Sequence, residues 1–178
     1  MNYIILILIT LALFLSSCNN KSEKQLIDSA EKIKTTTAFF SDTSIMDTFK
    51  VVLKGKEPKE MLLTFNIINV DGVVIFKKDF KASDLIQNYK ETVDLRKKNS
   101  QRSFMTDEFN FFLNEENFLW PALTTDQKPD QHSPDNDFFK ELQDSQLNGF
   151  KYRLSKETKV YIAWSAKEGQ VKVYYYCC

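Results

Sequence analysis

Two neighbouring residues, Asp71 and Gly72, constrain the fold of this chain more than any other pair. The segment before them, Met61 to Val70, is rich in residues that favour strands, and a second such segment, Val73 to Phe80, follows them. An Asp-Gly pair between two such segments predicts a tight β-hairpin, because both residues tolerate the positive φ of the central turn positions. The sequence therefore predicts an antiparallel sheet.

Further strands are expected on both sides of this hairpin. Phe49 to Leu53 precedes it, and near the C-terminus strands are expected at 150–155, 159–165 and 170–178, the last two joined by a turn at 166–169. Successive side chains of a strand point to opposite faces, so the final strand should divide its residues between two faces. We expect one face to carry Val171, Val173, Tyr175 and Cys177, and the other Lys172, Tyr174, Tyr176 and Cys178.

Helical spacing of apolar residues occurs at 22–33, 83–89 and 138–146. The expected N-caps of these helices are Ser22, Ser83, and either Asp135 or Asn136. Gly149 is expected to supply the left-handed residue after the last helix.

Aromatic residues dominate the segment 104–119. The alternation of Phe109 and Phe111 predicts a strand at 107–113, and most of these rings are expected in the core because each buries a large apolar area. Hairpins separated by helical segments are typical of the α+β class. We therefore expect a single domain with a mostly antiparallel sheet of about five to seven strands and two or three helices.

Charge and composition exclude several classes of protein. The chain has 178 residues, with 24 Lys and Arg against 24 Asp and Glu, so its net charge is zero. A balanced charge does not provide the broad basic surface on which nucleic-acid binding depends, so no nucleic-acid partner is expected. Only 4 glycines are present, too few for a glycine-rich loop that holds a phosphate.

The first eighteen residues carry a targeting signal. The apolar run from Tyr3 to Leu15 is too short to cross a hydrocarbon core of about 30 Å as a helix, but it has the length of a secretory signal. It ends in Leu15-Ser16-Ser17-Cys18. This motif resembles the lipobox of bacterial lipoproteins, in which an aliphatic residue and two small residues precede the acylated cysteine.

The resemblance implies cleavage between Ser17 and Cys18 and attachment of lipid to the Cys18 thiol. Residues 1–17 are then a signal peptide, 18–46 a lipid-anchored tether with a short helix, and 47–178 the α+β domain. Several acyl chains on one cysteine give durable membrane binding, which a single chain does not. Asn19, where inner-membrane lipoproteins often have Asp, favours the outer membrane, facing the periplasm. In size, anchor and layout the chain resembles small lipoproteins of Bacteroidetes-like bacteria that carry a domain of unknown function.

Other candidate sites leave alternatives open. Cys177 and Cys178 are neighbours, and a disulfide between neighbours is strained. They are either a redox pair, a soft-metal site, an intermolecular bridge, or simply the end of an apolar strand. The residues from Arg96 to Arg102 form either a phosphate-binding patch or a solvated loop. In the polar loop 124–137, His132 with Asp130 and Asp135 could hold a divalent metal or act as a base, or could simply be exposed.

Acid pairs are the remaining candidates for catalysis. Asp107-Glu108 and Glu115-Glu116 could act as the two carboxylates of a hydrolase, although adjacent acids are usually solvated. The sequence has no G-x-S-x-G, H-E-x-x-H or C-x-x-C motif, and we expect neither a cofactor nor a metal.

These observations favour a non-enzymatic binding or scaffolding module of the cell envelope for an unidentified protein or glycan. The alternatives are an envelope hydrolase that uses the acidic residues, and an inhibitor or immunity-type lipoprotein that acts through loop 124–137. The candidate contact surface is formed by Trp164, Tyr174 and Tyr176, whose rings should come close when their two strands pair. The competing interpretation is that a helix covers this face and that the rings belong to the core.

Overall fold

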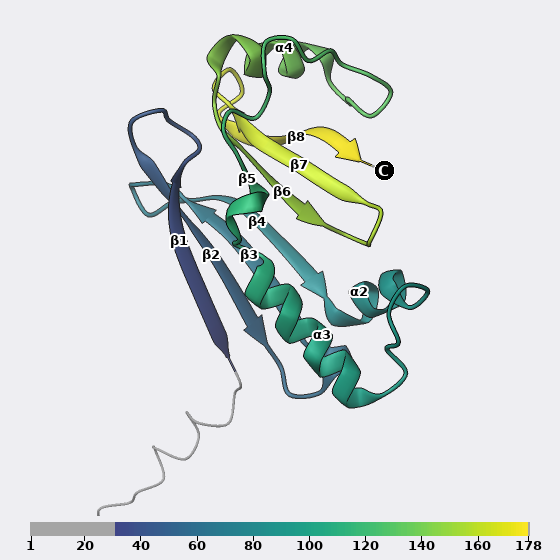
Figure 1. Cartoon of the computed structure of the whole chain (residues 1–178). Coiled ribbons are helices and arrows are strands. Elements are labelled where there is room, and N and C mark those ends of the chain that lie inside the picture. The colour runs from purple at the N-terminus through teal and green to yellow at the C-terminus, as the bar shows by residue number, and fades with distance from the viewer. Residues whose placement is uncertain (1–30, 178) are drawn as a thin grey trace, which may run out of the picture. The chain divides into compact units, whose positions relative to one another are not determined.

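Four strands that follow one another along the chain form the first sheet, in the order β1-β2-β3-β4 (Figure 1). The structure is a computed structural model that describes residues 31–177. All neighbouring strands of this sheet are antiparallel, and a short 3-10 helix, η1 (Pro58–Glu60), precedes the third. The strands are β1 (Lys32–Phe39), β2 (Met46–Lys54), β3 (Leu62–Ile68) and β4 (Val74–Lys81).

The hairpin predicted at Asp71-Gly72 is confirmed, and it joins β3 to β4. Gly72 has a φ of 79°, and its N–H donates to the carbonyl of Asn69 at 3.0 Å. Asp71 does not have a positive φ, so the turn needs only one left-handed residue and not two. The pairing of β3 with β4 shifts register between Ile67 and Ile68, next to this turn. The hairpin therefore contains a β-bulge.

The remaining strands form a second antiparallel sheet in the order β5-β6-β7-β8. The α+β class is therefore confirmed for residues 31–177, but the expectation of one sheet of five to seven strands is wrong, because eight strands divide into two sheets. The sequence pattern could not show this division, since it identifies strands but not their partners. The strands are β5 (Phe118–Leu119), β6 (Gly149–Arg153), β7 (Lys159–Ser165) and β8 (Gln170–Cys177).

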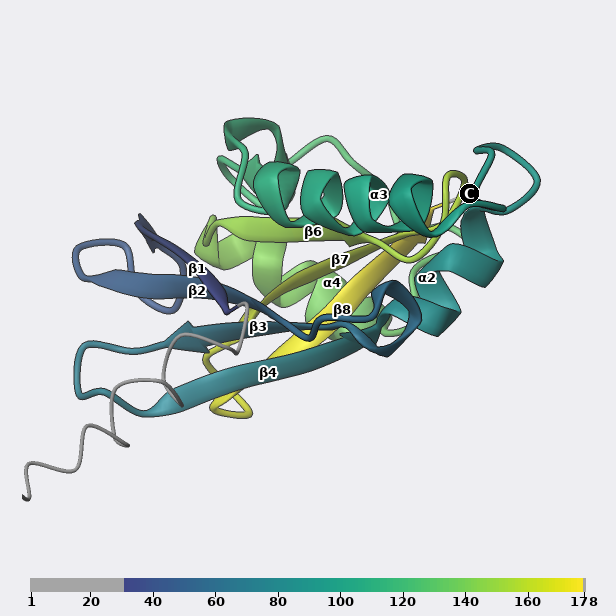
Figure 2. The same cartoon turned by 90° about the horizontal axis from the view of Figure 1, so that it is seen from below.

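The main core lies between the two sheets and helix α3 (Lys98–Phe111). Figure 2 shows α3 lying on one side of the first sheet, where it contacts β2. Aromatic rings from all three layers meet in this core: the Phe65 ring centroid is 5.0 Å from that of Phe112, and also 5.0 Å from that of Phe150. These contacts fix the position of the second sheet on the first, because large rings fill most of the space between them.

Helix α3 corrects two expectations. The predicted strand at 107–113 is helical up to Phe111, and residues 98–102, within the segment expected as a loop or phosphate patch, form the first turns of the same helix. The buried residues Phe104, Met105 and Phe109, followed by Phe112, recur with the spacing of one helix face, which the alternation of Phe109 and Phe111 concealed.

The other two helices agree with the sequence prediction. Helix α2 (Ala82–Tyr89) lies at the predicted 83–89, and α4 (Asn136–Ser145) lies at the predicted 138–146. The residue that ends α4 in a left-handed conformation is Gln146, with a φ of 52°, and not Gly149. Gly149 instead begins β6, where a side chain would collide with Ala122 and with the Tyr174 hydroxyl.

The domain begins earlier than expected. The segment assigned to the tether includes β1, which pairs with β2 along its whole length, so the sheet starts at Lys32 and not at 47. Three consecutive threonines at 35–37 lie in the middle of this strand, where β-branched residues are favoured. The signal peptide 1–17, Cys18 and most of the helix expected at 22–33 lie outside the described residues.

Candidate functional site

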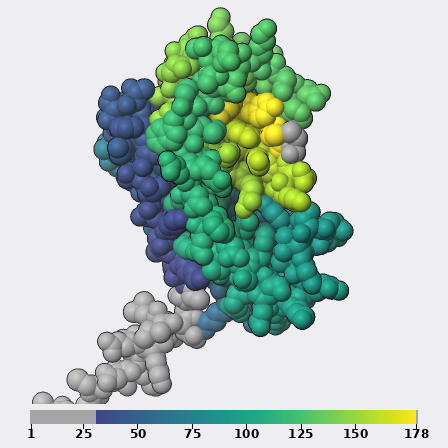
Figure 3. All heavy atoms as spheres, in the orientation of Figure 1, coloured from purple at the N-terminus to yellow at the C-terminus, as the bar shows by residue number. Residues whose placement is uncertain are grey.

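A half-open pocket of about 290 Å³ lies against β7 and β8, beside the loop 120–135 that leads into α4. In Figure 3 the C-terminal strands, coloured yellow, reach the surface next to the green segment that carries this loop. We call this site the tyrosine pocket. Its lining consists of Leu119, Ala122, Leu123, Gln127, Lys128, Asp130, Phe139, Tyr161, Tyr174 and Tyr175.

The floor of the tyrosine pocket is apolar and rigid. Ala122, Leu123 and Phe139 are buried in a second, smaller core between α4 and the second sheet. The Tyr174 hydroxyl donates to the carbonyl of Ala122 at 3.0 Å, and the Ala122 N–H donates to the carbonyl of Leu147 at 2.8 Å. Burial raises the pKa of Tyr174, so this hydroxyl stays protonated and keeps its hydrogen bond at any physiological pH.

A β-bulge places two consecutive tyrosines at the pocket. Tyr161 pairs with Tyr175, whereas the next residue, Ile162, pairs with Val173, so Tyr174 is an extra residue in β8. Both Tyr174 and Tyr175 therefore lie on the face that α4 partly covers. The Tyr161 ring stands nearly perpendicular to the Tyr175 ring, with centroids 5.5 Å apart. The pair forms a stiff aromatic wall, because tyrosine has few rotatable bonds.

Polar groups form the rim of the pocket. Asp130 Oδ2 accepts from the Tyr175 hydroxyl at 3.1 Å, while its Oδ1 accepts from the N–H of His132 at 2.8 Å. The carbonyl of His132 accepts from the N–H of Tyr176 at 3.0 Å, which fastens the loop to β8. Gln127 and the exposed Lys128 complete the rim. Loop 124–137, which the inhibitor alternative expects to contact a target enzyme, therefore forms one side of a pocket in this structure.

His132 and its acidic neighbours do not assemble a metal site. Residues 31–177 contain no group of three or more His, Cys, Asp or Glu side chains placed to hold a metal ion. The His132 ring packs edge-on against Tyr175, with centroids 5.9 Å apart. Asp135, one of the three expected ligands, instead caps α4 and binds Lys172.

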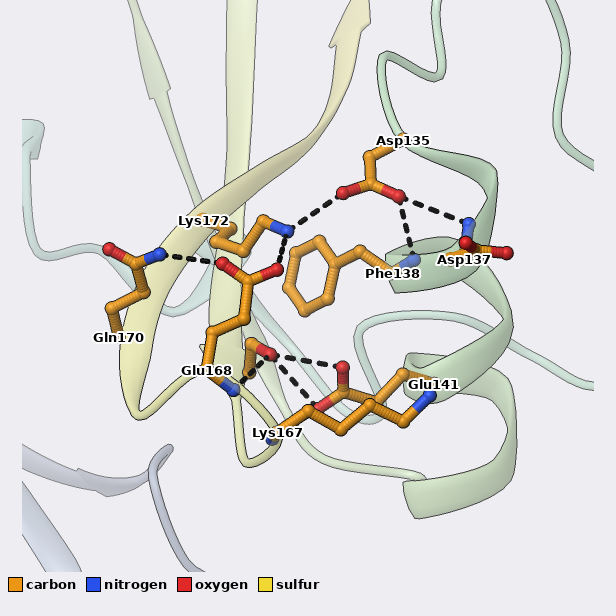
Figure 4. Close-up of polar contacts among 9 residues, drawn as sticks. Asp135, Asp137, Phe138, Glu141, Lys167, Glu168, Gln170 and Lys172 are labelled. Atoms are coloured by element: carbon orange, nitrogen blue, oxygen red, sulfur yellow. Dashed lines mark hydrogen bonds and ion pairs between the residues drawn. The ribbon is translucent and has the colours of Figure 1, made fainter.

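Asp135 fastens α4 to β8, as Figure 4 shows. One of its oxygens accepts from the N–H groups of Asp137 and Phe138 at 3.1 and 3.0 Å, and the other accepts from Lys172 Nζ at 2.7 Å. Lys172 also pairs with Glu168, and its ammonium lies 5.0 Å from the centre of the Phe138 ring. The hydrogen bond from Lys172 holds the pKa of Asp135 below its usual value, so the cap stays charged.

A second carboxylate fixes the turn between β7 and β8. Glu141 of α4 is buried, and its oxygens accept from Ser165 Oγ at 3.0 and 3.2 Å (Figure 4). The N–H of Lys167 donates to the same carboxylate at 3.2 Å. Asp135 therefore attaches the N-terminus of α4 to β8, and Glu141 attaches the middle of α4 to the β7–β8 turn.

The three residues of the predicted contact surface do not share a face. Tyr174 is 1% exposed and lies in the smaller core, whereas Trp164 packs against the main core on the opposite face of the sheet. Tyr176 is 44% exposed and pairs with Val160, a residue of the main core, so it also points away from Tyr174. The bulge at Tyr174 causes this difference, because it ends the simple alternation of faces along β8.

The acid pairs and the basic segment are held in separate contacts. Glu108 Oε1 pairs with Arg153 Nη2 at 3.0 Å, and burial raises the pKa of Glu108. Glu115 and Glu116 begin an exposed 3-10 helix, η2 (Glu115–Asn117). Arg96 pairs with Asp94 at 2.8 Å.

Cys177 ends β8 half-buried, and its neighbour Cys178 lies outside the described residues.

No family model, curated protein or solved structure matches this chain. Within residues 31–177, no helix is both long and apolar enough to cross a membrane.

Sequence reasoning missed two of the three tyrosines that line the pocket, Tyr161 and Tyr175. Tyr161 and Ala163 alternate with the core residues Val160 and Ile162, so the spacing along β7 does indicate a second face. Nothing in the sequence of β8 marks the bulge that brings Tyr175 to the same face as Tyr161.

Proposed function

We propose that this chain is a lipid-anchored, non-catalytic binding module of the cell envelope, and that a glycan is its ligand. The observation that carries the proposal is the tyrosine pocket, which places a rigid aromatic wall next to a carboxylate, an amide and an ammonium group. Ligand sites are typically concave, mostly apolar and equipped with a few polar groups that orient the ligand.

The chemistry of a sugar ring matches this arrangement. A sugar presents an apolar face of C–H groups, which packs on an aromatic ring, and an edge of hydroxyls that both donate and accept hydrogen bonds. Tyr161 and Tyr175 offer the rings, and Asp130, Gln127 and Lys128 offer the polar partners. A volume of about 290 Å³ lies at the small end of ligand pockets, so it suits one ring of a glycan and not a large cofactor.

The Leu15-Ser16-Ser17-Cys18 motif supports the proposed location. We propose that lipid on Cys18 holds the chain in the outer membrane, facing the periplasm. A module tethered there gains effective concentration toward ligands on the same surface, so weak binding in one small pocket is sufficient.

Titration of the full chain with N-acetylglucosamine and its β-1,4-linked dimer, followed by NMR chemical shifts, tests the glycan proposal. We expect shifts at Tyr161 and Tyr175 with both sugars, and none with cyclohexanol, which lacks the ring of hydroxyls. Tyr175→Ala should weaken binding by about tenfold, as loss of an interface tyrosine commonly does. The matched control is Tyr176→Ala, the next residue on the opposite face, which should bind like the wild type.

Several results would contradict the proposal. If neither sugar shifts any pocket residue at millimolar concentration, the ligand is not a glycan of this kind. If Tyr176→Ala weakens binding as much as Tyr175→Ala, the site is elsewhere. Hydrolysis of the dimer by the wild-type chain would overturn the non-catalytic part and favour the envelope hydrolase.

A further inference from the structure

Strand β6 is longer than the strand that pairs with its outer side. Strand β5 pairs only Phe118 with Phe150 and Leu119 with Gly149. Within residues 31–177, no strand continues this pairing along Lys151–Arg153 (Figure 1). Alternate residues of an antiparallel strand direct both N–H and C=O away from one neighbour, so this part of β6 presents backbone groups to an additional strand.

A trough borders this open edge of β6 and separates it from the C-terminal half of α3. One pocket of about 240 Å³ is lined by Phe111, Glu116, Asn117, Lys151, Arg153 and Lys159. A wider groove of about 600 Å³ shares Phe111 and Arg153 with this pocket and continues toward Thr92 and Val93. Phe111 is 53% exposed, although the nearby rings of Phe109 and Phe112 belong to the core. The trough therefore offers an apolar side chain next to unpaired strand backbone.

The charge of the smaller pocket indicates what would fit it. Lys151, Arg153 and Lys159 contribute three cations, and Glu116 is the single acid in the lining. Arg153 uses one nitrogen for Glu108, and a guanidinium has several further donors. Within the described part of the chain, Lys151 and Lys159 form no ion pair. An occupant with carboxylates would complement this surface.

We propose that an extended acidic peptide binds here, as an additional antiparallel strand that continues β5 along Lys151–Arg153. Backbone hydrogen bonds supply the affinity in this mode of recognition, and alternate side chains supply the specificity. A carboxylate enters the pocket between Lys151 and Lys159, and an apolar neighbour packs on Phe111. The site is separate from the tyrosine pocket, with which its lining shares no residue.

The test uses a fluorescein-labelled hexapeptide of alternating Glu and Val, added to the full chain and followed by fluorescence anisotropy. Two control peptides are matched to it: one with Lys in place of Glu, and one with alternate backbone nitrogens methylated, which cannot donate to a strand. We expect binding of the first peptide only. Its affinity should fall as salt is added, because the cations that attract it are near the surface.

Two variants locate the site. Lys151→Glu should weaken binding by about tenfold, whereas the matched control Lys50→Glu, a charge reversal in the middle of a first-sheet strand, should change it by less than about twofold. Phe111→Ser is a second variant at an exposed position, so it tests the trough even if Lys151→Glu does not fold. Hydrogen exchange should slow at Lys151–Arg153 when the peptide is bound.

The proposal is overturned if the Glu-Val peptide does not bind at millimolar concentration. Equal binding of the N-methylated peptide would show a charged surface without strand addition, which also overturns it. Equal binding by Lys151→Glu and by the wild type would place the site elsewhere. The sugar titration of Phe111→Ser separates the two proposals, because this substitution should weaken peptide binding and leave sugar binding unchanged.

Discussion

Two buried tyrosines differ in whether the hydroxyl has a partner, and this difference predicts opposite effects of the same substitution. The side chain of Tyr89 is 4% exposed, and its buried hydroxyl forms no hydrogen bond within residues 31–177. The side chain of Tyr174 is 1% exposed, and its hydroxyl donates to the carbonyl of Ala122 at 3.0 Å. We therefore expect Tyr89→Phe to leave the domain as stable or to stabilise it, and Tyr174→Phe to destabilise it.

The magnitudes follow from the general cost of an unpaired buried polar group. A buried hydroxyl without a partner costs about 1–3 kcal/mol, so Tyr89→Phe should raise the free energy of unfolding by up to about 1 kcal/mol after packing losses. Tyr174→Phe leaves the Ala122 carbonyl without its donor and should lower the free energy of unfolding by about 1–2 kcal/mol. For a domain near 150 residues, each 1 kcal/mol corresponds to roughly 2–4 °C in Tm.

Urea unfolding at pH 7, followed by circular dichroism, measures both effects, with equal m-values confirming that the unfolded states are comparable. Phenylalanine retains the ring contact of Tyr89 with Phe104, whose centroids are 5.0 Å apart, so packing changes little. Burial raises the pKa of Tyr89 to about 12, so its charge does not complicate the comparison at pH 7. Equal destabilisation by both substitutions would refute the reasoning, because it would show that the Tyr89 hydroxyl has a stabilising partner.

Three further predictions concern other parts of the chain. Gly149→Ala should lower the free energy of unfolding in urea by about 1–3 kcal/mol, since the added Cβ would lie 3.0 Å from the Cβ of Ala122; an unchanged midpoint would show that the segment of Ala122 can move away from β6 at little cost. Hydrogen bonds from Lys172 lower the pKa of Asp135 and of Glu168, so their stabilisation is present above about pH 4 and is lost as the pH falls through the lowered values. Lys172→Met should accordingly make Tm less dependent on pH between about pH 5 and 2, and an identical slope would argue against the network. Cys18→Ala should give an unprocessed or soluble chain; a variant that stays with membranes after a carbonate wash and keeps the processed mass would contradict the lipid anchor.

Local turn chemistry explains which parts of the fold could be predicted. The hairpins at Asp71-Gly72 and at 166–169 depend on glycines with positive φ and on the residues around them, so the sequence identifies both. The helix α4 was equally visible, because Asp135 caps it through its own side chain. Strand β1 was not, since its polar threonines become a strand only by pairing with β2.

The candidate site could be predicted only in part. The loop 124–137 was identified by its polarity and the tyrosines of β8 by their number, but the pocket depends on how these segments meet. A single bulged residue, Tyr174, decides which tyrosines face the loop. Whether a strand bulges depends on the packing on both of its faces, and periodicity along one segment does not contain that information. The open edge of β6 could not be predicted for a similar reason. It exists because β5 is too short to pair with the whole of β6.

The order of strands in the two sheets has a consequence for how the chain folds. Each sheet joins only strands that are consecutive along the chain, so most of its pairings close short loops and can form early. The first sheet can form once the chain is available up to Lys81, the last residue of β4. Its apolar face remains uncovered until α3 and the second sheet have folded onto it. If the chain is exported N-terminus first, as we propose, that half-built state is the stage most prone to aggregation, and it is where a holding chaperone would act.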